Sequence, residues 1–237
     1  MPEMTYTGAV HVGGPADVRR LPSLTIAKLA VGKMSNNAYL LRDVATGAGL
    51  LIDAAAEPEN LLELTRVDLG PDIALEDTEG PGDRTGIQQI VTTHQHFDHV
   101  GALAELVQAT GADTLAGADD ADALPVPVTR RLAHGDTIEV GETTLEVIHL
   151  RGHTPGSVAL LYRDPQGHGH LFTGDSLFPG GVGKTWKPED FASLIDDVEN
   201  RIFAELPDDT WFYPGHGDDS TLGAERASLP EWRERGW

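Results

Sequence analysis

Five histidines and two aspartates stand in contexts that suit the binding of metal ions. Four of them lie within residues 92–101 (TTHQHFDHVG), between a segment with the apolar pattern of a strand and one with the pattern of a helix. Alternate side chains of an extended chain point the same way, so His94 and His96 can converge on one cation. Asp98 and His99 lie where the chain turns into the helix and can face a second one. Imidazole and carboxylate are the ligands expected for Zn²⁺ in a chain without cysteine.

Three further segments each place one histidine or aspartate beside glycine, after a predicted strand: residues 152–156 (GHTPG), 173–176 (TGDS) and 214–217 (PGHG). Glycine allows positive φ angles and close backbone approach, which helps to aim a side chain into a cleft. The candidate ligands then form two sets of three and one bridging carboxylate: His94, His96 and His153; Asp98, His99 and His216; and Asp175. Two ions about 3.5–4 Å apart can share a hydroxide that acts as a nucleophile near neutral pH.

The elements that must position these residues follow from hydrophobic periodicity. Strands are predicted over residues 24–31, 37–41, 50–52, 87–92, 137–140, 144–150, 157–162, 170–173 and 211–213, and helices over 59–69, 100–110, 119–124 and 191–206. We expect an irregular N-terminal extension over residues 1–20, a surface loop over 70–86 and a C-terminal helix over 221–237. Each half opens with strands and later adds helices, so residues 1–237 are expected to form one α+β domain with layers α/β/β/α.

Composition excludes several classes of protein. The 237 residues carry 17 Lys and Arg against 38 Asp and Glu, a net charge of −21. This charge argues against nucleic acid, and therefore against a nuclease, and against anionic membrane surfaces as partners. The lack of cysteine excludes disulfides, thiolate metal sites, iron–sulfur clusters and a catalytic thiol. With no apolar run of about 20 residues and no signal-peptide pattern, we expect a cytoplasmic protein.

The pattern HxHxDH, followed in order by single His, Asp and His residues, resembles the metallo-β-lactamase superfamily from about Leu24 to His216. The resemblance implies a four-layer αββα sandwich with a dinuclear metal site at one edge of its two sheets. It implies that the seven candidates are the ligands and that Asp53 supports them from behind. Two divalent ions are expected as cofactors, with Zn²⁺ first and Fe or Mn as alternatives.

Residues 174–186 (GDSLFPGGVGKTW) are similar to a stretch of the glyoxalase II group, the hydroxyacylglutathione hydrolases. The resemblance implies that Lys184 and Trp186 contact the thiol part of a substrate, although the aromatic residue is Tyr in that group. Glyoxalase II holds glutathione with a helical C-terminal domain, and the stretch after His216 is long enough for one helix. The acyl group, the thiol carrier and the oligomeric state are therefore left open.

The expected activity is hydrolysis of a small-molecule thioester or related ester, in which a metal-bound hydroxide attacks the carbonyl carbon. Asp98 and Asp175 are the expected catalytic residues, the first moving a proton and the second bridging the ions. A lactonase is one alternative, because such enzymes share every ligand. A mononuclear-iron oxidoreductase of the persulfide dioxygenase type is another, with iron on His94, His153 and Asp175. A β-lactamase proper is disfavoured, because those enzymes lack the bridging aspartate.

The other five histidines are expected to take no part in metal binding: His11, His134, His149, His168 and His170. His168 and His170 belong to the sequence QGHGH, which is typical of a polar hairpin turn and has no acidic partner close in sequence. A single histidine is more often a solvated or hydrogen-bonded side chain than a ligand.

Overall fold

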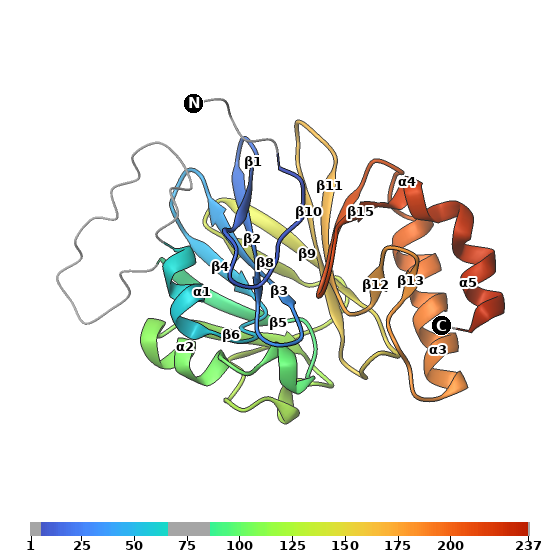
Figure 1. Ribbon diagram of the computed structural model, residues 1–237, viewed down its shortest axis with the longest axis horizontal. Helices are drawn as coiled ribbons and strands as arrows, with labels where there is room; N and C mark the ends of the chain where they lie inside the picture. The colour runs from blue at the N-terminus through green and yellow to red at the C-terminus, as the bar shows by residue number, and fades with distance from the viewer. Residues whose placement is uncertain (1–5, 66–85, 237) are drawn as a thin grey trace.

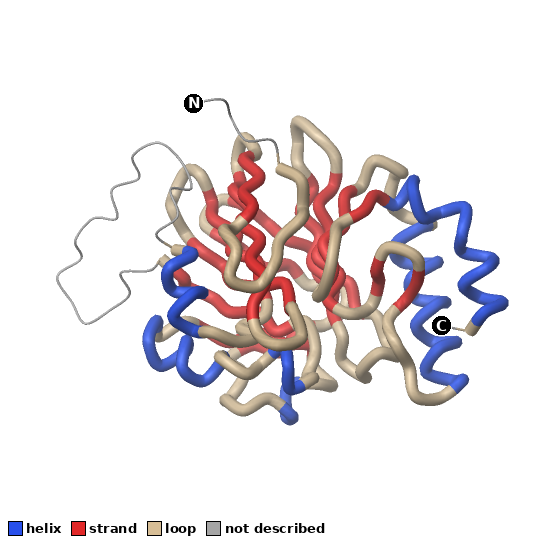
Figure 2. The backbone as a smooth tube through the Cα atoms, in the orientation of Figure 1, coloured by secondary structure: helices blue, strands red, loops and turns tan. Residues whose placement is uncertain are grey.

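The computed structural model describes residues 6–65 and 86–236. Two β-sheets lie face to face, and helices cover the outer face of each (Figure 1). Figure 2 shows the same arrangement as a central block of strands between two groups of helices. The layers follow the predicted order α/β/β/α, so the sequence-based fold class is confirmed.

The first sheet has seven strands, which follow one another in space as they do in the chain. They are β1 (Asp17–Arg20), β2 (Leu24–Val31), β3 (Asn36–Asp43), β4 (Gly49–Ile52), β5 (Ile87–Thr92), β6 (Asp113–Gly117) and β7 (Arg130–Leu132). Strands β1 to β4 pair antiparallel, and β4 to β7 pair parallel. The helices α1 (Pro58–Leu64) and α2 (Leu103–Thr110) cover its outer face. Because β4 and β5 are parallel, their carboxyl ends lie at the same edge of the sheet.

The second sheet has six strands in a different spatial order. From one edge to the other they are β15 (Ser220–Thr221), β14 (Trp211–Pro214), β11 (Gly169–Gly174), β10 (Val158–Arg163), β9 (Thr143–His149) and β8 (Thr137–Val140). Strands β11 and β14 are parallel, so their carboxyl ends also meet at one edge. A small ribbon follows β11, formed by β12 (Leu177–Phe178) and β13 (Gly181–Val182). The outer face is covered by α3 (Pro188–Val198), α4 (Leu222–Glu225) and α5 (Leu229–Arg235).

Alternation along the strands divides the apolar residues between three clusters. In β2, Leu24 and Ile26 belong to the core between the two sheets, whereas Ala27 and Leu29 pack under the first pair of helices. The third cluster lies between the second sheet and α3, with Leu194 as one fully buried member. Since successive side chains of a strand face opposite ways, both sheets are apolar on both faces.

The N-terminal prediction was wrong over its last four residues. Asp17–Arg20 form β1, which pairs with β2 at the edge of the first sheet. The segment DVRR has no apolar alternation, so the strand depends on this tertiary pairing and not on a local pattern. The short strands β6 and β7 were not predicted either, because they also depend on pairing with their neighbours and not on a local pattern. The predicted helix over 59–69 is α1 as far as Leu64, and most of the predicted loop over 70–86 lies outside the described residues.

Three predicted helices also differ from the elements that the structure shows. The segment 119–124 contains only one 3₁₀ turn, Ala121–Ala123. The helix expected over 191–206 is α3 followed by a π-helical segment, Glu199–Phe203. The tail after residue 221 is α4, a 3₁₀ turn (Arg226–Ser228) and α5, where one helix was expected. Pro230 lies in the first turn of α5, and its missing N–H suits a helix start better than a helix interior. No helix in the described part of the chain is long and apolar enough to cross a bilayer.

The core between the sheets offers a test of the packing. Phe172 is fully buried there, with its ring centroid 4.7 Å from that of Tyr213 and 5.3 Å from that of Tyr39. We expect Phe172→Ala to lower the free energy of unfolding by about 3–5 kcal/mol in urea titrations, because it leaves a cavity between the sheets. Phe172→Leu keeps most of the apolar volume and should cost less. A loss for Phe172→Ala within about 0.5 kcal/mol, as for a surface residue, would contradict this packing.

Candidate metal centre

The predicted ligands lie at one edge of the sandwich, at the carboxyl ends of strands from both sheets. His94 follows β5 of the first sheet, while Asp175 and His216 follow β11 and β14 of the second. An isolated bridge between Asn36, the first residue of β3, and His216 joins the two sheets at this edge. The site therefore forms only where both sheets end together.

Three groups of possible ligand atoms lie within 4.8 Å of one another: His94, His96 and His153; His94, His99 and Asp175; and Asp98, His99 and His216. The first and third groups have the same members as the two sets of three predicted from the sequence. All seven candidates thus lie together. No other group of this kind is found in the described ranges.

Asp175 faces both sets. Its Oδ2 atom lies 3.6 Å from His153 Nε2 and 3.5 Å from His216 Nε2, and its Oδ1 atom lies 3.4 Å from His99 Nε2. His94 Nε2 is slightly further from Oδ2, at 4.0 Å. A carboxylate in this position can offer one oxygen to each of two cations.

The hydrogen bonding of the rings fits a divalent ion. His94 Nε2, His99 Nε2, His153 Nε2 and Asp175 Oδ1 are buried and have no hydrogen-bond partner among the described residues. In contrast, the Nδ1 atoms on the other side of the rings are held, for instance that of His153 by Lys184 O (2.8 Å) and that of His216 by Met34 O (3.0 Å). These contacts leave the Nε2 atoms facing one another. Unpaired buried polar atoms are unfavourable, and a bound cation would satisfy them.

Asp53 lies behind the rings, as the family resemblance implied. It follows β4 in a left-handed conformation (φ 59°), which aspartate tolerates better than most residues. Its carboxylate accepts hydrogen bonds from Thr93 N (2.7 Å), Thr93 Oγ1 (2.8 Å) and His99 Nδ1 (2.8 Å). Thr93 Oγ1 in turn lies 3.0 Å from His94 Nδ1. One buried carboxylate therefore orients ligands from both sets.

Burial and charge set different protonation states for the rings. Burial holds the pKa of His94 and His153 below the usual value, so both are neutral and ready to bind a metal ion. Burial also opposes charge on His99, but the carboxylates of Asp53 and Asp175 outweigh it and raise its pKa to about 10. The pKa of Asp175 is held well below its usual range despite burial, because the rings of His216 and His99 lie against the carboxylate and stabilise its charged form. Without an ion, His99 is thus an imidazolium between two carboxylates.

Glycine is required at two points of this edge. A Cβ atom at Gly215 would collide with Asp175 Oδ1 and with the ring of His99. Gly174 has φ 48°, and a Cβ there would meet Thr93 Oγ1 at 2.5 Å. The predicted reason for glycine beside the ligands, close approach and positive φ, holds at these positions.

One supporting carboxylate was not predicted. Asp120 is fully buried, and its Oδ1 accepts a hydrogen bond from Gly156 N (2.7 Å). Its Oδ2 accepts from Gln95 N (3.0 Å) and Thr154 Oγ1 (2.5 Å). Asp120 thereby ties together the two loops that carry His96 and His153. It lies in the segment 119–124 that was predicted as a short helix, next to two other aspartates, so no local signal marks it.

Asn36 was also missed, because the predicted strand began one residue later. Its Nδ2 donates a hydrogen bond to Asp98 Oδ2 (2.9 Å). The same Oδ2 atom lies 3.6 Å from His99 Nε2 and 3.5 Å from His216 Nε2. Asn36 therefore orients the one carboxylate of the second set.

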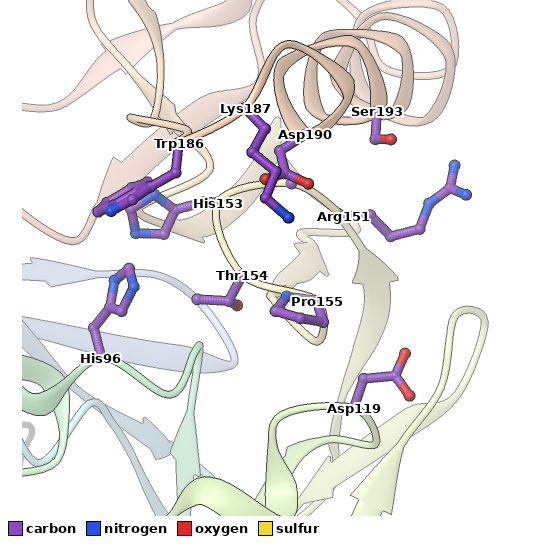
Figure 3. A pocket seen from close by; sticks show the side chains of 11 residues that line it. His96, Asp119, Arg151, His153, Thr154, Pro155, Trp186, Lys187, Asp190 and Ser193 are labelled. Atoms are coloured by element: carbon purple, nitrogen blue, oxygen red, sulfur yellow. The ribbon is translucent and has the colours of Figure 1, made fainter.

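A cavity of about 560 Å³ opens beside the first set of ligands (Figure 3). Trp186 stands at its edge, with its ring centroid 5.8 Å from His96 and 6.1 Å from His153. Lys187 and Arg151 also line the cavity, and neither was predicted. Arg151 is paired with Asp197 through two hydrogen bonds of 2.7 and 2.8 Å.

Lys184, a predicted substrate contact, is not among the lining residues of this cavity. Its side chain is exposed, and Nζ lies 5.1 Å from the ring centroid of Trp186. Its backbone carbonyl accepts the hydrogen bond from His153 Nδ1. Among the described residues, Lys184 thus reaches the site through its backbone and through Trp186.

The histidines outside the centre do not join a group of possible ligands in the described ranges. His170 lies in β11 and is buried, so its assignment to a polar turn was wrong. A hydrogen bond joins its Nδ1 to the Tyr213 hydroxyl (2.8 Å), and burial lowers its pKa to about 3. It is a neutral histidine of the core.

Comparison with known proteins settles the family. Residues 31–216 match the family model described as the metallo-beta-lactamase superfamily. The chain belongs to this superfamily. Its relatives include the hydroxyacylglutathione hydrolase GloC of Haemophilus influenzae, 28% identical over 87% of this chain and 97% of that protein. A hydroxyacylglutathione hydrolase of Rhodopseudomonas palustris is 34% identical over 85% of this chain and 67% of that protein.

Solved structures of superfamily members agree with this assignment. ETHE1 from Myxococcus xanthus is 27% identical, with a TM-score of 0.69 over 88% of this chain and 84% of that one. TTHA1623 in a di-iron-bound form is 32% identical, with a TM-score of 0.65 over 86% of this chain and 98% of that one. This superfamily member is thus an enzyme with hydrolase homologues, and its histidine-rich edge is its candidate centre for divalent metal ions.

The charge on His99 predicts how metal binding depends on pH. Because the pKa of His99 is about 10 in the metal-free chain, an ion must displace a proton at any lower pH. We expect the affinity of this set for Zn²⁺ to rise by at least about tenfold per pH unit between about pH 6 and 8. Competition with a chelator, corrected for the chelator's own protonation, measures this slope. Asp53→Asn removes one of the two charges and should flatten it, and a pH-independent affinity would contradict the assignment.

Proposed function

We propose that the protein hydrolyses thioesters of small molecules with the help of two divalent metal ions. The observation that carries the proposal is the convergence of five imidazoles and two carboxylates, in which four inward atoms are buried and lack partners among the described residues. Similarity to GloC over nearly the whole of both chains favours a thioester, since a hydroxyacylglutathione is one. Chemistry and comparison therefore point to the same class of substrate.

Each proposed ligand set would hold one ion: His94, His96 and His153 the first, and Asp98, His99 and His216 the second. Asp175 would lie between the ions and contact both. Ions bound here would polarise the substrate carbonyl and lower the pKa of a water molecule. Zn²⁺ is the proposed metal, because imidazole and carboxylate are its usual ligands where thiolate is absent. Iron and manganese are the alternatives, and the di-iron form of TTHA1623 favours iron among them.

Asp98 is the proposed proton acceptor. Its Oδ2 is held by Asn36 Nδ2 at 2.9 Å, which orients the carboxylate toward the rings of His99 and His216. It would take the proton that the attacking water loses. A thiol leaving group with a pKa of about 8.5 departs as a thiolate without a strong acid, so the site needs no further proton donor for it.

The cavity next to Trp186 is the proposed binding place of the thiol carrier. Its volume of about 560 Å³ suits a small molecule. Trp186 offers an exposed aromatic face beside His96 and His153, and Lys184 lies over the same ring. Lys187 carries a charge that has no ion-pair partner among the described residues, so an anionic group of the carrier could pair with it. The walls carry charges of both signs, because Asp119 and Asp190 also line them.

A second candidate is an iron-dependent oxidation of a thiol-derived substrate. His94, His153 and Asp175 form a set of two histidines and one carboxylate, with Asp175 Oδ2 4.0 and 3.6 Å from the two Nε2 atoms. Such a set with open positions suits iron and O₂. The complete second set of Asp98, His99 and His216 favours the hydrolase. A lactonase would share every ligand.

Metal content and a substrate panel separate these activities. Freshly purified protein, and protein stripped and reloaded with Zn²⁺ or Fe²⁺, would be assayed on a hydroxyacylglutathione, other thioesters, lactones and a persulfide with O₂. We expect two ions per chain and a kcat/KM for thioesters at least about tenfold above that for lactones, a difference of about 1.4 kcal/mol. Asp175→Ala should lose both ions and all activity. One iron per chain with O₂ consumption would instead identify the oxidoreductase.

The role of Trp186 predicts a change in KM. Trp186→Ala should raise KM for the thioester about tenfold with kcat within about twofold, because it removes contact with a part of the substrate that does not react. Trp186→Phe retains an aromatic face and should stay close to the wild type. If both variants kept the wild-type KM, the carrier would not lie against this ring.

A further inference from the structure

Lys28 is buried in a place where the strand pattern calls for an apolar side chain. It follows Leu24 and Ile26 on the face of β2 that points between the sheets, and it is 0% exposed. It is the only buried lysine in the part of the chain that the structure describes. Its Nζ donates to Gly8 O (2.6 Å), Gly217 O (2.8 Å) and Asp219 Oδ1 (2.7 Å). All three donors of the ammonium group are therefore used.

Asp219, the partner of Lys28, is equally enclosed. Its side chain is 1% exposed, and its Oδ2 accepts hydrogen bonds from Tyr6 Oη (2.6 Å) and Trp211 Nε1 (3.1 Å). Gly8 approaches so closely that a Cβ atom there would collide with Asp219 Oδ2. A buried ion pair is weak evidence for stability, because apolar residues of similar volume often serve as well. Because every polar atom of the Lys28 and Asp219 side chains is hydrogen-bonded, we infer a role for the pair other than stability.

The network ends on the segment that carries His216. Gly217 O, in the residue after His216, accepts hydrogen bonds from both Lys28 Nζ and Asn37 Nδ2 (2.9 Å). Two residues before His216, Pro214 O accepts from Tyr39 Oη (2.6 Å) and again from Asn37 Nδ2 (2.9 Å). The backbone is thus held on both sides of His216, and Lys28 supplies the one charged contact.

We propose that the buried Lys28–Asp219 pair positions His216 and so sets the affinity of Asp98, His99 and His216 for their metal ion. The inference rests on the metal-binding part of the proposed function and is independent of the substrate. Within the described residues the hydrogen bonds of the pair reach only this set, and the loops of His96 and His153 are held by Asp120 instead. Lys28 is accordingly a positioning residue, acting through the backbone of Gly217.

A paired substitution provides the test. Lys28→Met alone would leave Asp219 charged and buried, so the variant to use is Lys28→Met with Asp219→Asn. Stepwise Zn²⁺ affinities of the full chain would be measured by chelator competition, with His216→Ala identifying the step that belongs to the second set. We expect the paired variant to bind the first ion within about twofold of the wild type and the second at least about tenfold more weakly. Tyr6→Phe, which removes one hydrogen bond to Asp219, should weaken the same step by a smaller factor and keeps the test available if the paired variant does not fold.

Two comparisons separate positioning from general destabilisation. In a His216→Ala background, the paired substitution should have no effect on the remaining affinity. Asp43→Asn is the matched control: Asp43 is a buried carboxylate at the opposite end of β3 and accepts hydrogen bonds from Thr46 N and Thr143 Oγ1. It should leave both steps unchanged.

The proposal would be overturned by equal losses at both steps, by an unchanged second step in the paired variant and in Tyr6→Phe, or by a wild-type chain that binds no second ion. A chain that binds two ions and hydrolyses no thioester would contradict the proposed function but not the proposed role of Lys28.

Discussion

The contacts of one carboxylate organise the whole edge of the molecule. Asp175 lies within 4.0 Å of four imidazole nitrogens, those of His94, His99, His153 and His216. Hydrogen bonds alone do not satisfy this arrangement, because most of the rings already use their other nitrogen and several inward atoms have no partner among the described residues. Cations between the rings and the carboxylate would satisfy them. The two sheets have to end at the same place for this contact to exist.

The rings of the metal centre are held in place by contacts from several separate parts of the chain. Thr93 and Asp53 at the ends of β5 and β4, a backbone carbonyl of the loop after β13, and another before β3 each hold one ring from behind. No two of these supports are close neighbours in the chain. The ring orientations are therefore set by the packed sandwich before an ion arrives, which reduces the reorganisation that binding requires.

Much of this centre could be predicted from the sequence, and the reasons for the gaps are physical. One cluster was found because four candidate ligands fall within six residues after an apolar strand: His94, His96, Asp98 and His99. The glycines beside His153, Asp175 and His216 mark tight turns. Lys28, Asn36 and Asp120 carry no such signal. Their partners lie far away in the sequence, so only the folded contacts reveal them: Lys28 with the segment after β14, Asn36 with Asp98, and Asp120 with the two ligand loops. The strand β1 was missed for the same reason, since its sequence takes on extended form only beside β2.

The enclosed ion pair joins segments that lie far apart in the sequence. Tyr6 and Asp219 are 213 positions apart in the sequence, and Lys28 and Gly217 are 189 apart. Such distant contacts form late, because the entropy of closing a long loop must be met before they contribute. If His216 depends on them, a newly made chain completes its second ion site only after these distant segments have come together. Occupancy of that site would then separate finished molecules from partly folded ones, which makes bound metal a marker of completed assembly within a single chain.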